Sequence, residues 1–323
     1  MQQQLSKVLS QFGIKGEIEW ARPIKTGHIN QTNVAAVQGR LYTVQTINTY
    51  VFPDADGVME NLAVTEHLRK KVIARGGDPL REALHFYTTA EGKGNWKDEE
   101  GNQWRVYDYV DGCTTYDVAD DLQILTDAGL AFGNFQKLLS DFDGASLNET
   151  IVDFHNTRQR YRNLEEGIAR NASGRLSNAG AEVEFYLSRA ETATRLVEQI
   201  ESGILPLRVT HNDTKFNNIL IDNATKKPLC VIDLDTIMPG LAAYDFGDAV
   251  RFCANSAAED EKDLDKVYFC LDKFEAFAKG FIGGSDGFFT EAELDSMAWG
   301  CIVMTLECGS RFLLDYLDGD KYF

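Results

Sequence analysis

Polar residues that could carry out phosphoryl transfer are gathered in two short stretches of this chain. The first stretch holds Asp213, Lys215 and Asn218 between apolar runs, and the second places Asp233 where the next apolar run ends. A carboxylate base, an amide ligand and a carboxylate ligand follow one another in this order in kinases. The two stretches therefore predict transfer of a phosphoryl group from a nucleotide.

Each of these side chains has a task in that chemistry, which consists mostly of positioning and charge neutralisation. Asp213 would accept the proton of the attacking hydroxyl, and Lys215 would place positive charge beside the γ-phosphate. Asn218 and Asp233 would bind Mg²⁺ through hard oxygen ligands. Asp235 points the same way as Asp233 if this segment is a strand, so it could share the metal directly or through water.

Two further residues are expected to support the loop. His211 would orient it rather than react. Asp245 begins an Asp-Phe-Gly sequence, a label often attached to the metal aspartate of protein kinases, but it does not directly end an apolar strand as Asp233 does. Asp245 would instead accept backbone hydrogen bonds from the catalytic loop, with Asp248 and Arg251 on the acceptor side. A solvated turn is the alternative for Asp245.

A structural explanation competes with the catalytic one at this loop. A lone His-x-Asp sequence occurs by chance, and buried His–Asp pairs often only satisfy each other's hydrogen bonds. Several polar residues between apolar runs are costly to bury without a purpose. The combined pattern therefore favours function.

Composition limits the class of protein. A chain of 323 residues with 44% hydrophobic residues can bury a large core and is long for one domain, so two lobes are expected. The net charge of -18 argues against nucleic acid or an anionic membrane as the main partner. We expect no signal peptide and no membrane span, and hence a cytoplasmic protein. The six cysteines form no C-x-x-C and are expected to be reduced thiols.

Apolar periodicity predicts the elements that position these residues. Strands are expected over 24–37 with a turn at Gly27, over 41–47 and over 103–110, with a helix over 57–74. Long amphipathic helices are expected over 122–139, 183–200, 264–281 and 291–317. Thr290 and Glu293 form a capping box before the last of these helices.

These elements predict an α+β protein of two lobes. Residues 1–111 would form a nucleotide-binding lobe, with a small antiparallel sheet and a helix. Residues 112–323 would form a larger, mainly helical lobe that holds the catalytic loop and the acceptor.

The chain resembles the aminoglycoside phosphotransferase and choline kinase superfamily, whose loop usually reads His-Gly-Asp followed by Asn and a later Ile-Asp. It resembles N-acetylhexosamine 1-kinases more closely, through the segments 27–30, 104–107, 185–188, 207–215, 232–240, 245–248 and 307–313. The resemblance implies a two-lobed protein-kinase-like fold that uses ATP and Mg²⁺. It also implies phosphorylation of the anomeric hydroxyl of N-acetylglucosamine or N-acetylgalactosamine.

The same resemblance suggests where the sugar binds. It makes Asp213 the base, places His28, Arg311 and Tyr322 near the sugar, and packs Phe252 beside that pocket. Arg311 has otherwise apolar neighbours and needs acceptors, which sugar hydroxyls or a carboxylate such as that of Glu307 would supply. The alternatives are an internal salt bridge for Arg311 and a turn-stabilising role for His28.

The expected nucleotide site departs from the general kinase pattern. Only Gly27 marks a phosphate loop, and Gln45 stands where a strand lysine is usual. The glutamate that would pair with such a lysine stays open between Glu60 and Glu66. Adenine is expected against the strand between the lobes, beside Tyr107, Tyr109 and Val110.

Other functions stay open. The chain could be a related kinase for an aminoglycoside, choline, homoserine or another sugar, and the missing lysine allows a nucleotide-binding protein without turnover. A metal-dependent phosphoesterase would use His211, Asp213, Asp233 and Asp235 as ligands. The expected partners are a small sugar and ATP, without nucleic acid or membrane, and the expected state is a monomer or weak dimer.

Overall fold

The computed structural model describes residues 1–24, 29–116, 121–257 and 261–321, and the chain forms two compact units built from separate segments. Unit 1 consists of Met1–Asp117, Leu138–Ile151 and Asn217–Met238. Unit 2 consists of Val118–Lys137, Val152–Phe216 and Pro239–Phe323. Because these units interleave along the chain, the expected lobe boundary between residues 111 and 112 stays a prediction.

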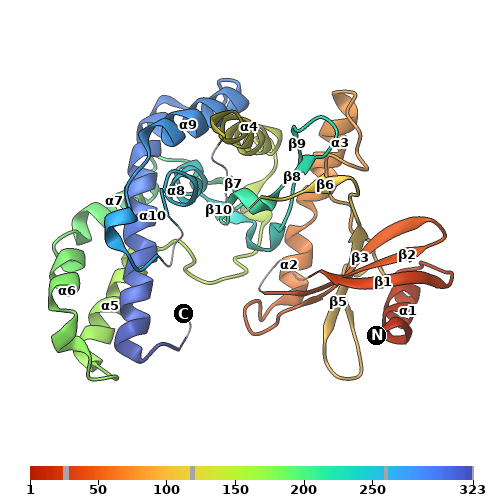
Figure 1. Ribbon diagram of the computed structural model, residues 1–323, viewed down its shortest axis with the longest axis horizontal. Coiled ribbons are helices and arrows are strands. Elements are labelled where there is room, and N and C mark those ends of the chain that lie inside the picture. The colour runs from red at the N-terminus through yellow and green to blue at the C-terminus, as the bar shows by residue number, and fades with distance from the viewer. Residues whose placement is uncertain (25–28, 117–120, 258–260, 322–323) are drawn as a thin grey trace. The chain divides into compact units, whose positions relative to one another are not determined.

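Unit 1 contains a five-stranded antiparallel sheet with the strand order β1-β2-β3-β5-β4 (Figure 1). Its strands are β1 (Ile18–Ile24), β2 (Gln31–Val37), β3 (Arg40–Ile47), β4 (Trp96–Lys97) and β5 (Gln103–Asp108). Val34, Val44 and Val106 are completely buried, as suits β-branched residues in strands. The strand segment expected over 24–37 with a turn at Gly27 corresponds to the end of β1 and to β2, which pair antiparallel, while Gly27 itself lies outside the described residues.

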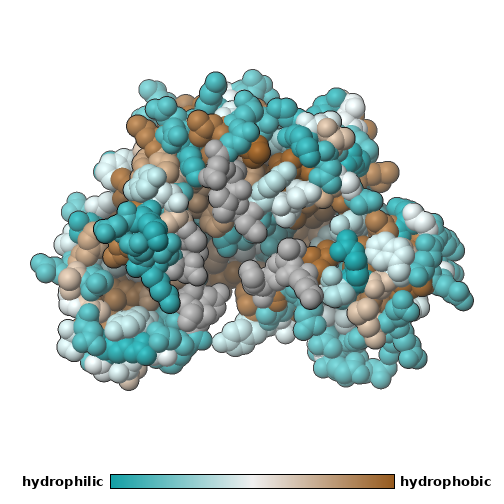
Figure 2. All heavy atoms as spheres, viewed as in Figure 1, coloured by the Kyte–Doolittle hydropathy of each residue, from teal (hydrophilic) through white to brown (hydrophobic). Residues whose placement is uncertain are grey.

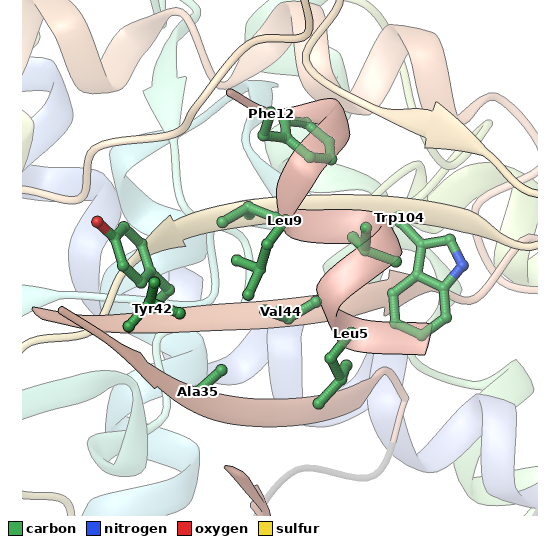
Figure 3. Close-up of a cluster of buried hydrophobic side chains, with 10 residues drawn as sticks. Leu5, Leu9, Phe12, Ala35, Tyr42, Val44 and Trp104 are labelled. Carbon is green, nitrogen blue, oxygen red and sulfur yellow. The ribbon is translucent and has the colours of Figure 1, made fainter. Parts of the chain in front are cut away.

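Helix α1 (Gln2–Gln11) covers one face of this sheet and was not expected from the sequence. Its apolar residues recur at helical spacing, and Leu5 and Leu9 pack with Phe12 against the sheet (Figure 3). Val44 and Trp104 supply part of the sheet side of this cluster. The first residues of the chain therefore close the core of the sheet.

The helix expected over 57–74 is two helices, α2 (Ala55–Asn61) and α3 (Val64–Ala74). At the end of α2, the side chain of Asn61 donates to the carbonyls of Asn148 and Ile237, both at 2.8 Å. These hydrogen bonds tie the break between the helices to the later segments of unit 1. A second sheet of unit 1 has the order β6-β8-β9 and comprises β6 (Cys113–Thr114), β8 (Ile219–Asp222) and β9 (Pro228–Val231).

Unit 2 is mainly helical, which confirms the expected character of the later part of the chain. Its helices are α4 (Leu122–Leu138), α5 (Thr157–Arg170), α6 (Gly180–Leu187), α7 (Ala190–Glu201), α8 (Ala242–Cys253), α9 (Leu271–Ser285) and α10 (Glu291–Asp318). The short strands β7 (Arg208–Thr210) and β10 (Met238–Gly240) pair with each other. The predicted capping box at Thr290 and Glu293 is present at the start of α10.

Two of the expected helices have different bounds in the structure. The helix expected over 183–200 is split, because α6 ends at Leu187 and α7 begins at Ala190. The helix expected over 264–281 begins only at Leu271, since Leu264–Lys266 forms a single 3-10 turn. Apolar spacing continues through both breaks, so periodicity alone does not mark them.

Glycines let two pairs of helices in unit 2 approach backbone to backbone. A Cβ atom at Gly300 of α10 would lie 2.0 Å from the carbonyl oxygen of Ala243 in α8. A Cβ atom at Gly133 of α4 would lie 2.1 Å from the carbonyl oxygen of Phe281 in α9. Because larger residues do not fit at these crossings, the glycines set the separation of α8 from α10 and of α4 from α9.

Helix α10 bears on the expectation of no membrane span, since among the described residues it is the helix long and apolar enough by length and composition to cross a membrane. A buried core helix passes the same test. In unit 2 α10 packs along α8, α5 and α7, and Val303 and Leu317 are completely buried (Figure 1). Hydrophilic residues dominate the face in Figure 2. These observations favour α10 as a core helix.

Candidate active site

Strand β7 leads directly into the predicted catalytic loop in unit 2. Val209, Thr210 and His211 are buried, so the loop begins inside the core. Gly240 of β10 lies close to β7, because a Cβ atom there would be 2.3 Å from the Thr210 hydroxyl oxygen. The pairing of β7 with β10 therefore holds the start of the loop close to Gly240.

Asp245 anchors this loop through its main chain. Its carboxylate accepts hydrogen bonds from the backbone N–H groups of His211 (2.9 Å) and Asn212 (2.7 Å) and from the Gln136 side chain. The Thr214 hydroxyl donates to the Asp245 carbonyl at 2.5 Å. These include the backbone hydrogen bonds expected for Asp245, which is 1% exposed. Burial raises the pKa of the Asp245 carboxyl, although His211 and the hydrogen bonds oppose that rise.

The backbone turns sharply just before the predicted base. Asn212 has φ 62°, in the left-handed region that favours glycine and tolerates asparagine better than most residues. The related superfamily usually has glycine there, so the asparagine suits the same turn. His211 lies edge-on to Phe132 and Phe135, and its Nδ1 accepts a hydrogen bond from the Asp213 N–H at 3.3 Å. This arrangement is consistent with an orienting role for His211.

Asp213 and Lys215 lie together where the loop becomes accessible. The Lys215 Nζ is 3.1 Å from Asp213 Oδ1, and the two side chains are 37% and 26% exposed. A base must reach its substrate, and a cation beside it can compensate charge on a phosphoryl group. The exposure of this pair contrasts with the buried residues around it.

The three predicted metal ligands, Asn218, Asp233 and Asp235, lie in unit 1. Strands β8 and β9 pair there, and the Ile232 N–H donates to the Asn218 carbonyl at 2.9 Å, which brings Asn218 near the residue before Asp233. Asp233 has φ 59°, a strained conformation for a residue other than glycine. One amide and one carboxylate suit Mg²⁺, which usually keeps water and phosphate oxygens as its other ligands.

Asp235 is held by other side chains of unit 1. Arg105 donates to both of its carboxylate oxygens, and Asn30 donates to Oδ2 at 2.7 Å. Arg105 also donates to the Gln45 side-chain oxygen. Arg105 was not predicted as a functional residue. The signal in the sequence was a charged residue between apolar residues of a strand, where a buried charge needs a partner.

The other predicted nucleotide residues lie on or after β3 and β5 in unit 1. Gln45 is buried and donates to the Thr32 hydroxyl at 2.7 Å. Tyr107 pairs with Thr43 across the sheet, and the Tyr109 N–H donates to the Leu41 carbonyl at 3.1 Å. Val110 is 8% exposed, and Gly27 lies outside the described residues. Of the two candidate glutamates, Glu60 accepts from Asn148 and Glu66 lies 3.4 Å from Arg69.

The predicted acceptor residues that are described lie on two helices of unit 2. Phe252 of α8 and Arg311 of α10 are each half-buried, while His28 and Tyr322 lie outside the described residues. Arg251 and Asp248, which were expected to line the acceptor side, lie 3.0 Å apart.

Glu307, a buried carboxylate on α10, was expected as a possible acceptor for Arg311, but two of its partners were not expected from the sequence. Glu307 accepts hydrogen bonds from His155 Nδ1 (2.9 Å) and the Thr157 hydroxyl (3.0 Å). Burial alone would lower the pKa of His155, but Glu307 reverses this effect and raises it above the ordinary value. The sequence carried no signal for this pair, because its partners are far apart along the chain.

Residues 21–277 match the sequence profile of the phosphotransferase enzyme family. A microcompartment-associated aminopropanol kinase superposes with a TM-score of 0.64 at 15% identity, covering 98% of this chain and 94% of that chain. A spectinomycin phosphotransferase in complex with ADP and spectinomycin has a TM-score of 0.59 at 15% identity, covering 99% and 90%. An ethanolamine kinase from Plasmodium vivax has a TM-score of 0.53 at 15% identity, covering 96% and 80%.

These likenesses confirm the expected α+β, protein-kinase-like fold, with an N-terminal antiparallel sheet and a mainly helical C-terminal part. The profile match spans most of the sequence and includes both stretches of predicted catalytic residues. The chain belongs to the phosphotransferase enzyme family.

Proposed function

We propose that this protein is an ATP- and Mg²⁺-dependent kinase that transfers the γ-phosphoryl group to the anomeric hydroxyl of an N-acetylhexosamine. Membership of the phosphotransferase enzyme family supports the reaction class. The observation that carries the proposal is the loop itself, where an accessible Asp213 lies beside Lys215 on a backbone fixed by buried Asp245. The choice of sugar is supported by the resemblance of 207–215 and 307–313 to N-acetylhexosamine 1-kinases.

In the proposed reaction the sugar hydroxyl oxygen bonds to the γ-phosphorus, the bond from that phosphorus to the β–γ bridging oxygen breaks, and ADP leaves. Asp213 takes the hydroxyl proton, and Lys215 compensates charge on the transferred group. Asn218 and Asp233 would hold Mg²⁺, which neutralises phosphate charge when bound.

The remaining binding roles are also proposals. Gly27 and Gln45 would lie near the phosphates, and the end of β5 and the residues after it would contact adenine through Tyr107, Tyr109 and Val110. The sugar would be bound by His28, Phe252, Arg311 and Tyr322. Phe252 and Arg311 are supported by their place in the unit that also carries Asp213.

The test is sugar-dependent release of ADP. Purified protein with ATP and Mg²⁺ is assayed against a panel of sugars, and we expect release with N-acetylglucosamine or N-acetylgalactosamine together with formation of the sugar 1-phosphate. Equal ADP release with and without each sugar would contradict the proposal.

Asp213→Asn tests the base. It should lower turnover by about a hundredfold or more while ATP binding is nearly unchanged, because only proton acceptance is lost. Asp286→Asn is the matched control, since it makes the same chemical change at an exposed residue at the end of α9 and should leave turnover unchanged. Wild-type turnover in Asp213→Asn would remove that residue from the role of base.

A second candidate is a kinase for a cationic hydroxyl compound such as an amino alcohol or an aminoglycoside. The net charge of -18 favours it, because a cation is attracted to an acidic protein. Ethanolamine, choline, homoserine and spectinomycin therefore belong in the same panel, and turnover with one of them alone would select this candidate. Nucleotide binding without turnover, or hydrolysis with manganese or zinc and no nucleotide, would indicate the two remaining alternatives.

We also propose that the protein acts in the cytoplasm as a monomer or weak dimer, without nucleic acid or membrane as a partner. The acidic charge supports the absence of a nucleic-acid partner. Sedimentation equilibrium would measure the oligomeric state directly.

A further inference from the structure

A positive charge buried in the sheet of unit 1 reaches the segment that carries the proposed metal ligand. Arg105 is 3% exposed and lies on β5 directly opposite Gln45 on β3. The charge missing at Gln45, where kinases usually carry a strand lysine, is therefore present one strand away.

Arg105 makes a paired contact with Asp235. Its Nη1 and Nη2 atoms lie 2.5 and 2.9 Å from the two carboxylate oxygens of Asp235. Its Nε and Nη2 atoms also donate to the Gln45 side-chain oxygen at 2.9 and 2.7 Å. Gln45 is fixed from its other end by the Thr32 hydroxyl, so the whole group is rigid.

The Asp235 backbone and side chain have further partners in unit 1. Asn30 donates to the carboxylate at 2.7 Å, and the Thr150 hydroxyl donates to the Asp235 carbonyl at 3.3 Å. Both carboxylate oxygens are thus occupied, and the negative charge is compensated by a guanidinium. A carboxylate in this state is a poor candidate for direct binding of Mg²⁺.

The pair also interacts electrostatically with the proposed metal ligand. Burial would lower the pKa of Arg105, but Asp235 raises it, with smaller contributions from Tyr107 and Asp233, so the guanidinium stays charged. A buried charge of this kind is stable only with its partner, and removing one member leaves the other uncompensated.

Asp233 needs such support because its backbone is strained. It occupies the left-handed region and precedes the 3-10 turn Leu234–Thr236, which includes Asp235. Strained conformations persist where the surrounding structure fixes them. Here the hydrogen bond between Ile232 and Asn218 fixes one side of Asp233, and the Arg105–Asp235 pair fixes the other.

We propose that Arg105 is a positioning residue that replaces the usual strand lysine and holds Asp233 in place for Mg²⁺ through Asp235. Asp235 is then a support for the metal ligand and does not bind the metal itself. This inference rests on the proposed function, because it takes Asp233 as the residue that binds Mg²⁺.

The experiment measures nucleotide binding by calorimetry with and without Mg²⁺, which needs no acceptor. Arg105→Met should raise the Mg²⁺ concentration required for tight ATP binding by about tenfold or more, as is typical when the support of a metal ligand is lost. ATP binding in EDTA should not change. Arg105→Lys should raise the Mg²⁺ requirement less than Arg105→Met does, because lysine keeps the charge and loses the paired geometry.

Two further variants keep the test decisive. Arg105→Met combined with Asp235→Leu removes both charges, so it should fold even if a single change does not, and it should show the same rise in the Mg²⁺ concentration required for tight ATP binding. Arg81→Met is the matched control, because Arg81 pairs with Asp222 at 2.8 Å at the end of β8 in the same unit. It should leave the Mg²⁺ requirement unchanged.

An unchanged Mg²⁺ requirement in folded Arg105→Met, or in the double variant, would overturn the inference. The inference would also be overturned if Asp235→Asn raised the Mg²⁺ requirement for ATP binding and neither Arg105 variant did. That result would make Asp235 a direct ligand of Mg²⁺. Failure of the proposed function is distinguishable, since it would appear as wild-type protein that binds ATP with Mg²⁺ but turns over no acceptor.

Discussion

Adjacent glycines near the end of α9 should respond in opposite ways to the same added methyl group. Gly284 faces α4, and a Cβ atom there would lie 2.4 Å from the Leu130 carbonyl oxygen. Gly283 is exposed, and a Cβ atom there would have no neighbour within 4 Å. Gly284→Ala and Gly283→Ala therefore make the same chemical change at a helix crossing and in open space.

The structure sets the size of each effect. Ordinary contacts of a Cβ atom begin near 3.4 Å, so Gly284→Ala must move α9 from α4 by roughly 1 Å, and a backbone oxygen cannot yield as a flexible side chain does. Overpacking of this kind costs about 1–3 kcal/mol. Alanine gains about 0.5–1 kcal/mol over glycine in a helix. Gly284→Ala should lose about 1–2 kcal/mol net, and Gly283→Ala should gain up to about 1 kcal/mol.

Urea unfolding measures both changes as shifts of the midpoint at a constant slope. Turnover should fall in Gly284→Ala alone, because α4 carries Gln136, which donates to Asp245, and Phe132, which contacts the His211 ring. The reasoning from the helix crossing would be refuted if Gly284→Ala were as stable as the wild type. It would also be refuted if Gly283→Ala lost as much stability as Gly284→Ala.

Three further predictions concern other parts of unit 2. Asp245→Asn leaves two backbone N–H donors facing one acceptor oxygen, so the free energy of unfolding should fall by about 2–4 kcal/mol. Turnover should fall as well; denaturation measures the first change and ADP release the second. The raised pKa of His155 gives stability that is present below about pH 6.5 and lost as the pH rises through the folded-state pKa. The free energy of unfolding measured from about pH 6 to 9 should show this loss. Glu307→Gln should make the free energy of unfolding depend less on pH over that range. Thr290→Ala removes the cap of α10 and should lower the free energy of unfolding by about 1 kcal/mol, and an unchanged melting curve would contradict it.

The sequence by itself determined the chemistry that this protein can attempt and the type of most of its elements. Asp213, Asn218 and Asp233 can be recognised from nearby residues alone, because each follows or precedes an apolar run that must become buried. The same holds for the capping box of α10, whose partners Thr290 and Glu293 are three residues apart. Patterns within a few residues reflect propensity and burial directly, so they can be read without a structure.

Support for the loop from Asp245 was expected from the sequence, but only the tertiary structure decided which other polar residues pair inside each unit. Arg105 and Asp235 are separated by 130 positions, and His155 and Glu307 by 152. The break between α6 and α7 likewise leaves apolar spacing intact, so periodicity could not reveal it. Whether a buried charge is compensated depends on groups that meet only after the chain has folded, and no local pattern records which groups those are.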